Sequence, residues 1–160
     1  MNKNTNITLL SILALLTLSI FSAFIIEYGL GHKPCKLCLY QRYPYFISIF
    51  LILNIIIMKK YIKLSLLSLA LVSLFGSIIG FYHFGIEQGF FSESLVCEAK
   101  NLDQNLSKED ILKQLSKNTV SCKTVTFRVF GLSLASINTI FSFVLFSIFL
   151  ALFKNYENNK

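Results

Sequence analysis

A chain of 160 residues is long enough for one domain, and only 14% of its residues are charged, against roughly 25% in an ordinary soluble domain. The mean hydropathy is +0.64, so the composition indicates an integral membrane protein surrounded by lipid. The net charge of +7 does not by itself predict nucleic-acid binding, because the distribution of charge decides the partner of a basic protein. We therefore expect no nucleic-acid partner.

The first apolar run, residues 7–26, has twenty residues without a charge and is long enough to cross a bilayer. A cleaved signal peptide is the alternative, but its apolar core is usually about 7–15 residues long and ends at a small-residue cleavage site. This run is longer and lacks a clear site of that kind. It predicts a first transmembrane helix.

A short polar loop follows and contains a Cys-x-x-Cys pair, Cys35 and Cys38, just ahead of Arg42. Such a pair closes a small disulfide loop whose sulfurs exchange readily with other thiols. The neighbouring lysines and Arg42 make the surroundings positive, which favours thiolate over thiol. If the next helix begins near Cys38, then Cys38 and Arg42 share one of its faces. Pro44 fits such a helix only within its first turn.

Three further apolar runs predict transmembrane helices at about 41–58, 64–84 and 129–153. Gly76 and Gly80 in the third run have a spacing that allows close helix approach in lipid. The fourth run contains side chains that can hydrogen-bond to other helices: Ser133, Ser136, Asn138 and Ser142.

The long polar segment between the third and fourth runs contains Cys97 and Cys122. Within it, residues 107–115 carry an apolar stripe behind a capping Ser107. A short amphipathic helix on the membrane surface fits this pattern, and a solvated loop helix fits it equally well.

The lysine distribution predicts the topology. With the N-terminus inside, the cytoplasmic segments carry six lysines and one glutamate, whereas the long loop carries six cations and six acids. The tight turn Lys59-Lys60-Tyr61-Ile62-Lys63 is the clearest cytoplasmic marker. Both termini are then cytoplasmic, and both cysteine pairs face the oxidising side, where disulfides persist.

The four cysteines could have several alternative roles. A structural zinc site usually combines two closely spaced pairs, but Cys97 and Cys122 are 25 positions apart. Haem attachment requires a histidine directly after the Cys-x-x-Cys pair, where this chain has Leu39. Two structural disulfides are the main alternative, although a Cys-x-x-Cys loop closes too little chain to stabilise a fold much. Redox chemistry explains the pair better.

A disulfide that oxidises other proteins must itself be reoxidised, and a lipid-soluble electron acceptor could reach the membrane boundary laterally. Arg42 could hydrogen-bond a quinone carbonyl there and stabilise its reduced anion. Alternatively, Arg42 anchors the protein to lipid headgroups. His83 ends the third run near the same surface, and an interfacial histidine without a redox role is its alternative.

The stretch Cys35-Lys36-Leu37-Cys38-Leu39-Tyr40-Gln41-Arg42-Tyr43-Pro44-Tyr45 resembles the C-x-L-C-x-x-Q-R-x-P-Y signature of the bacterial disulfide bond formation protein B (DsbB) family. Tyr82-His83-Phe84-Gly85-Ile86-Glu87 is similar to the family's Y-H-x-G-V-E stretch. Cys97 and Cys122 match its loop cysteine pair, and Phe130-Gly131-Leu132-Ser133 resembles the start of its fourth helix. The related vitamin K epoxide reductase-like class carries its Cys-x-x-Cys after the loop cysteines, an order that this chain does not follow.

The resemblance implies a quinone-dependent thiol oxidase of the bacterial inner membrane that reoxidises a periplasmic DsbA-like thioredoxin-fold protein. By position, Cys97 forms the mixed disulfide with this partner, Cys122 exchanges with Cys35, and Cys38 becomes the thiolate that engages ubiquinone or menaquinone. Arg42 then stabilises Cys38. His83 and Leu134 fall where the family lines its quinone pocket, although some members have methionine where this chain has Leu134.

We therefore expect one all-α integral membrane domain, residues 1–160, built as a four-helix transmembrane bundle with two periplasmic loops. The second loop is expected to carry the short amphipathic helix. The alternative function is a non-enzymatic membrane scaffold with two structural disulfides, which would not turn over with added dithiol and quinone.

Overall fold

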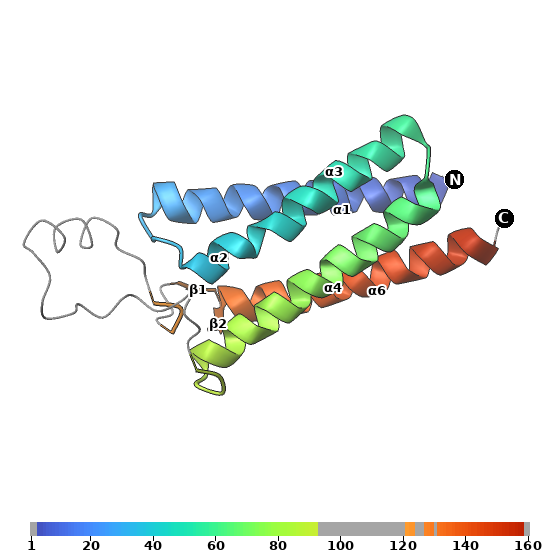
Figure 1. The fold of residues 1–160 in the computed structure, drawn as a ribbon. Coiled ribbons are helices and arrows are strands. Elements are labelled where there is room, and N and C mark those ends of the chain that lie inside the picture. The colour runs from blue at the N-terminus through green and yellow to red at the C-terminus, as the bar shows by residue number, and fades with distance from the viewer. Residues whose placement is uncertain (1–2, 93–120, 124–126, 130, 159–160) are drawn as a thin grey trace, which may run out of the picture.

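The computed structural model describes residues 3–92, 121–123, 127–129 and 131–158. Four long helical segments dominate this part of the chain and run alongside one another (Figure 1). The predicted amphipathic helix at 107–115 and Cys97 lie outside the described residues. The expected class, an all-α membrane protein with four spanning helices, is confirmed.

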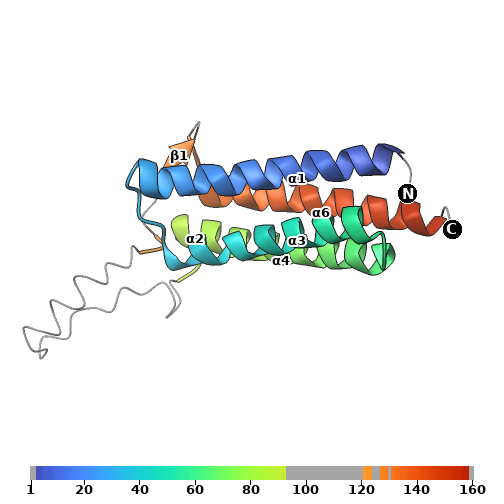
Figure 2. The same cartoon turned by 90° about the horizontal axis from the view of Figure 1, so that it is seen from above.

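Each segment is long and apolar enough to cross a bilayer. The first combines α1, Lys3–Phe24, with a π-helical turn η1, Ile25–Gly29. The second combines the short α2, Lys36–Tyr40, with α3, Arg42–Met58. The third is α4, Ile62–Glu87, and the fourth is α6, Leu134–Asn158. The N- and C-terminal ends lie at one end of the bundle, and α2 lies at the other (Figures 1 and 2).

The apolar core fills the half of the bundle nearest the termini. It joins α1, α3, α4 and α6 through residues that are almost without exposure: Leu9, Ile12, Leu16, Ile52, Ile55, Leu66, Leu69, Ala70, Leu145 and Phe149. Large apolar side chains such as Phe50 and Phe143 point outward instead. Because the outer surface of a spanning bundle faces lipid, this exposure is the expected arrangement for a membrane protein.

Two glycines let α4 pack closely against its neighbours. A Cβ atom built on Gly80 would lie 2.7 Å from Thr139 Oγ1 of α6 and 3.2 Å from Thr139 Cα. A Cβ atom on Gly76 would lie 3.3 Å from Pro44 Cβ of α3. The small-x-x-x-small spacing in the sequence therefore marks a close approach, in which side chains of α3 and α6 pack against the bare backbone of α4.

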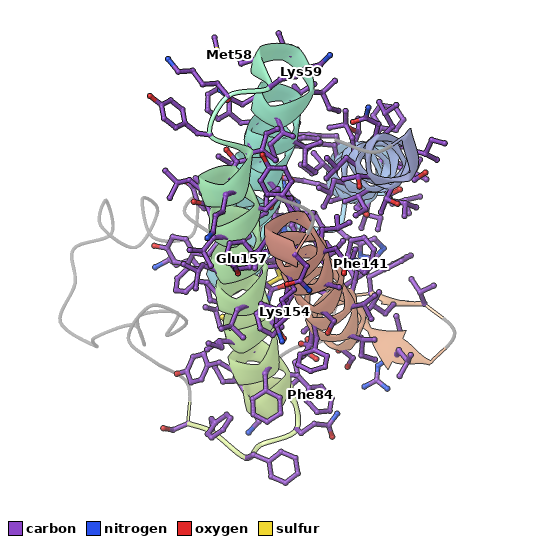
Figure 3. All side chains as sticks on the ribbon, turned by 90° about the vertical axis from the view of Figure 1, so that its right-hand side faces the viewer. Met58, Lys59, Phe84, Phe141, Lys154 and Glu157 are labelled. Carbon is purple, nitrogen blue, oxygen red and sulfur yellow. A yellow bond between two sulfur atoms is a disulfide. The ribbon has the colours of Figure 1, made fainter. Side chains whose placement is uncertain are left out.

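The end of the bundle that carries the termini is tied by charge as well as by packing. Lys63 Nζ donates to Glu157 Oε1 at 2.6 Å and so joins α4 to α6. Figure 3 looks down the bundle from this end and labels Glu157 and Lys154 on α6, with Met58 and Lys59 at the turn after α3. Both side chains of the ion pair are half exposed, so its contribution to stability is small, about 0–1 kcal/mol.

The opposite end positions the cysteines. Pro44 lies in the first turn of α3, where its missing N–H group costs least. Ahead of α6, β1, Arg128–Val129, pairs antiparallel with β2, Leu132–Ser133, around Gly131 at a positive φ of 83°. The Ser133 hydroxyl accepts from the Ser136 N–H group at 3.2 Å, so this serine caps α6. Its side chain also hydrogen-bonds to Glu87 of α4, as expected for a polar side chain between helices.

Candidate functional site

A disulfide between Cys35 and Cys38 occupies the N-terminus of α2. Cys35 is the N-cap residue, and its Sγ accepts a hydrogen bond from the Cys38 N–H group at 3.1 Å. This cap begins the helical segment at Lys36, five residues ahead of the expected position 41. Cys35 is buried, with 5% exposure, whereas Cys38 is half-buried. Access to the pair is therefore greater at Cys38.

His83 of α4 lies directly beside the disulfide. Its Nε2 atom is 3.5 Å from Cys35 Sγ, and its Nδ1 atom is 3.0 Å from Gln41 Nε2. With the Gln41 amide donating, Nδ1 accepts, and a neutral His83 carries its proton on Nε2, facing the sulfur. A further hydrogen bond joins His83 to the backbone of Cys122. His83 and Gln41 are both buried, so these contacts are shielded from solvent.

Glu87 follows His83 by one helical turn and extends the polar cluster. Glu87 Oε1 lies 3.7 Å from His83 Nε2, and the glutamate side chain is only 6% exposed. Its second oxygen, Oε2, is buried and has no hydrogen-bond partner among the described residues. The carboxylate hydrogen-bonds to the Ser133 side chain and is attracted by the charge of Arg128, but burying an oxygen without a hydrogen bond of its own is still costly.

Cys122 belongs to the same buried cluster as Cys35. The cluster also contains Leu37 and Ile86, with Cys38 packed against it. Cys122 is 1% exposed and is itself disulfide-bonded. Residues that are 87 positions apart in sequence thus meet at one end of the bundle, with sulfur atoms of the loop and of the Cys-x-x-Cys pair in one apolar environment.

A cavity of about 280 Å³ opens on the other side of Cys38. It lies between α1, the junction of α2 and α3, and the first two turns of α6. Cys38, Arg42 and Leu134 all line it, so three of the residues singled out in the sequence share one chamber. The remaining wall is largely apolar and includes Ile20, Ala23, Ile26, Ile137 and Phe141.

Arg42 is held by two groups that the sequence did not reveal. Its guanidinium donates to Glu27 Oε2 at 2.6 Å and lies 5.2 Å from the centre of the Phe24 ring. Both partners come from the first spanning segment, and Glu27 lies in the π-helical turn that often marks a functional position. Arg42 is therefore fixed at the cavity wall by an ion pair and a cation–π contact.

Asn138 provides a second polar group on the wall. Its Oδ1 atom accepts from the Tyr45 hydroxyl, which joins α6 to α3. Its Nδ2 atom is buried and has no partner among the described residues, although Asn138 lines the cavity. Nδ2 lies against α4, where a Cβ atom built on Gly80 would be 3.0 Å away, so it belongs to the helix contact.

The structure brings together most of the residues expected to act. Cys38, Arg42 and Leu134 line the cavity, whereas His83 is not among its lining residues and reaches the wall through Gln41. Cys97 lies outside the described residues. Gln41, Glu27, Asn138 and Glu87 were missed as site residues. The sequence signal for two of them was present, because Gln41 precedes Arg42 and Glu87 lies four residues after His83.

Comparisons with known proteins agree on one family. Residues 4–152 match the family described as "Disulfide bond formation protein DsbB". The chain is 31% identical over 154 residues to "Uncharacterized protein RP370" of Rickettsia prowazekii (strain Madrid E), across 92% of this chain and 89% of that protein. No solved structure matches the chain. The chain therefore belongs to the DsbB family, and is a multi-pass membrane oxidoreductase of disulfide-bond formation that works with a DsbA-like partner.

Proposed function

We propose that this protein reoxidises a periplasmic thioredoxin-fold dithiol protein and passes the two electrons to ubiquinone or menaquinone. The observation that carries the proposal is the position of the Cys35–Cys38 disulfide between two environments. Cys35 shares a buried cluster with Cys122, and Cys38 lines a largely apolar cavity with Arg42. In this proposal, the disulfide receives electrons through Cys122 and passes them from Cys38 to an acceptor bound in the cavity.

The relay is a series of thiol–disulfide exchanges. A partner thiolate attacks Cys97 and forms a mixed disulfide, which frees the Cys122 thiolate. Cys122 attacks Cys35, which breaks the Cys35–Cys38 bond and frees the Cys38 thiolate. The partner's second thiol then releases the oxidised partner, and the Cys97 thiolate attacks Cys122, re-forming the loop disulfide and leaving the Cys35/Cys38 dithiol.

The cavity fits a quinone headgroup in its chemistry. Pockets for such ligands are mostly apolar, with a few placed polar groups, and this wall has that composition. Arg42 is a donor for a carbonyl oxygen, and Asn138 adds a polar side chain to the wall. When bound, a quinone accepts two electrons and two protons, so one partner dithiol is oxidised for each quinol formed.

The residues of this chain would prepare the reaction in distinct ways. Arg42 favours the Cys38 thiolate and orients an oxygen through its planar donor fork. Leu134 closes the apolar wall at the start of α6. His83 lies against Cys35 and faces it with Nε2, and Gln41 connects the imidazole to the cavity. His83 would therefore act on the reacting disulfide and, through Gln41, on the bound quinone.

The high reduction potential expected of the partner explains why a quinone is needed as the final electron acceptor. Strongly oxidising thioredoxin-fold proteins have potentials near −120 mV, and about 30 mV corresponds to a tenfold change in equilibrium for a two-electron couple. Oxidising such a partner by thiol exchange alone is therefore unfavourable. Coupling the last step to quinone reduction drives the preceding exchanges forward.

The test is quinone reduction by the purified protein supplied with a reduced thioredoxin-fold partner. We expect catalytic loss of quinone absorbance and oxidation of one partner dithiol per quinol. Cys35→Ser should abolish both while the protein remains helical and inserted. A membrane scaffold with structural disulfides would show no turnover in the wild type, and turnover retained in Cys35→Ser would contradict the relay.

A further inference from the structure

The buried cluster around Cys35 contains more ligating groups than an exchange of thiols requires. Cys35, Cys38 and His83 place two sulfurs and one imidazole nitrogen within 4.8 Å of one another. Glu87 adds a carboxylate, 3.7 Å from His83 Nε2, whose other oxygen is buried and unpartnered among the described residues. We propose that the reduced protein binds Zn²⁺ through Cys35, Cys38, His83 and Glu87.

The donor set is one that Zn²⁺ prefers. Thiolate sulfur, imidazole nitrogen and carboxylate oxygen are its common protein ligands, and four of them in a tetrahedron make a closed site. This set differs from a four-cysteine zinc site, because it takes only the Cys-x-x-Cys pair and leaves the loop pair out. The ligands come from the N-terminus of α2 and the last turns of α4, two elements that the fold already holds together.

The distances from His83 Nε2 to its two neighbouring donors are close to those of tetrahedral coordination. Bond lengths of about 2.3 Å for Zn–S and about 2.0–2.1 Å for Zn–N imply a sulfur–nitrogen separation of about 3.5 Å. Cys35 Sγ and His83 Nε2 are 3.5 Å apart. The same reasoning gives about 3.4 Å between nitrogen and a carboxylate oxygen, and His83 Nε2 to Glu87 Oε1 is 3.7 Å. Two adjustments complete the tetrahedron: the two sulfurs must separate, which reduction of their bond allows, and the Glu87 carboxylate, which lies outside the group of atoms within 4.8 Å of one another, must approach them.

The surrounding groups support the ligands as in known metal sites. A ligating histidine usually hydrogen-bonds through its other ring nitrogen, which fixes the ring orientation. Gln41 occupies that position on Nδ1 at 3.0 Å, and its amide can turn to offer oxygen to an Nδ1–H group. The Cys38 N–H group already points at Cys35 Sγ and would stabilise a thiolate there. Cys38 lines the cavity, so a metal ion has a route to the cluster.

Binding involves no net oxidation or reduction. The Cys35/Cys38 dithiol gives up two protons, His83 binds through a deprotonated Nε2, and Zn²⁺ takes the four donors. The bound metal would hold both sulfurs as thiolates and block their attack on any acceptor. The site would therefore make the reduced protein sensitive to zinc, with chelation restoring its thiols.

The binding test uses the full chain with Cys97→Ser and Cys122→Ser, so that Cys35 and Cys38 are the only thiols. After reduction with a phosphine and removal of excess reagent, Co²⁺ is titrated as a spectroscopic probe, and Zn²⁺ is then added as a competitor. We expect one equivalent of Co²⁺ to give tetrahedral ligand-field bands and a thiolate-to-cobalt band, both lost on adding Zn²⁺. Absence of these bands, or binding that also occurs before reduction, would overturn the proposal.

Variants separate this site from simple chelation by a dithiol. Gln41→Leu should weaken metal binding about 10–100-fold, as for other groups that orient a ligand, and His83→Gln and Glu87→Gln should weaken it at least as much. Glu157→Gln, which alters a glutamate at the opposite end of the bundle, and His32→Gln should leave the Co²⁺ affinity unchanged. If His83→Gln and Glu87→Gln bound Co²⁺ as tightly as the parent, the proposed site would be wrong.

The assay contains no quinone and no protein partner, so its result is independent of the proposed electron transfer. Circular dichroism of each variant checks that the helices are retained. If a variant loses its helices, a second assay on the reduced Cys97→Ser/Cys122→Ser protein takes its place. In this assay Zn²⁺ should slow the alkylation of Cys35 and Cys38, and a chelator should restore the alkylation rate. Alkylation unaffected by Zn²⁺ would count against the site.

Discussion

At the scale of single residues, the site combines one local motif with contacts that join distant parts of the chain. The Cys-x-x-Cys pair and Arg42 lie within eight positions, so the sequence placed them together directly. The contact between His83 and Cys35 spans 48 positions, and that between Arg42 and Glu27 joins two different helices. Such partners depend on how helices dock, which local spacing does not encode.

Arg42 provides the first prediction at this scale. Arg42→Lys should weaken apparent quinone binding, because lysine loses the planar fork, and Arg42→Ala should weaken it more. A charge-assisted hydrogen bond contributes roughly 1.5–3 kcal/mol, so the loss in Arg42→Ala should be about ten- to a hundredfold. Quinone titration measures this, with single-turnover partner oxidation as the control that should be nearly unchanged. Normal quinone kinetics in Arg42→Ala would leave Arg42 only its structural contacts with Glu27 and Phe24.

Asn138 provides the second prediction. Asn138→Ala removes a polar side chain that lines the cavity, and we expect about fivefold weaker quinone binding, equivalent to one neutral hydrogen bond. The matched control is Tyr45→Phe, which removes the hydrogen bond between Tyr45 and Asn138 but keeps the amide donor. Quinone titrations of the two variants are compared. Equal losses in both would mean that Asn138 acts through the helix contact rather than through a ligand.

At the scale of the elements, periodicity and composition predicted the spanning helices because each must satisfy its own backbone in lipid. The ends of the helices were harder to predict, since they depend on individual caps. Cys35 caps the N-terminus of α2 through its sulfur atom. Ser133 caps α6, which therefore begins only after the short β1–β2 pair. The π-helical turn of Ile25–Gly29 had no signal in the sequence.

The approach of α4 to α6 gives a prediction about stability. Gly80→Ala would place a methyl group 2.7 Å from Thr139 Oγ1, which already donates to the Ala135 carbonyl at 2.8 Å and so cannot turn away freely. We expect destabilisation of about 1–3 kcal/mol, as for other overpacked sites. The measurement is a denaturant titration in detergent, with Gly29→Ala as the control because its nearest neighbour would be 3.5 Å away. If the two variants had equal free energies of unfolding, the added methyl group on Gly80 would be accommodated between α4 and α6 without loss of stability.

At the scale of the whole molecule, the four candidate spans in the described residues and the lysine distribution predict that both termini lie on one side of the membrane. Both views show the chain ends together, opposite α2, the helix that carries the Cys35–Cys38 pair (Figures 1 and 2). The sequence predicted this arrangement because charge asymmetry and span length are global properties. It did not predict how closely Cys122 approaches Cys35, since that depends on the path of the long loop.

The topology prediction concerns the two ends of the bundle. A reporter fused at Lys60 should read cytoplasmic, and an impermeant thiol reagent should reach Cys97 and Cys122 from the periplasm after reduction. Labelling of Cys122 should be slow, because it is 1% exposed. The reverse pattern would place the cysteines in a reducing compartment, where their disulfides would not persist.

The central claim is that Cys35 and Cys38 pass electrons to a quinone and receive them through the loop cysteines. The most direct measurement compares two reactions of Cys97→Ser: quinone reduction by its prereduced Cys35/Cys38 dithiol in one turnover, and steady oxidation of a reduced thioredoxin-fold partner. We predict that the first is retained and the second is lost. Partner oxidation at the wild-type rate in Cys97→Ser, or no quinone reduction by the prereduced protein, would contradict the account.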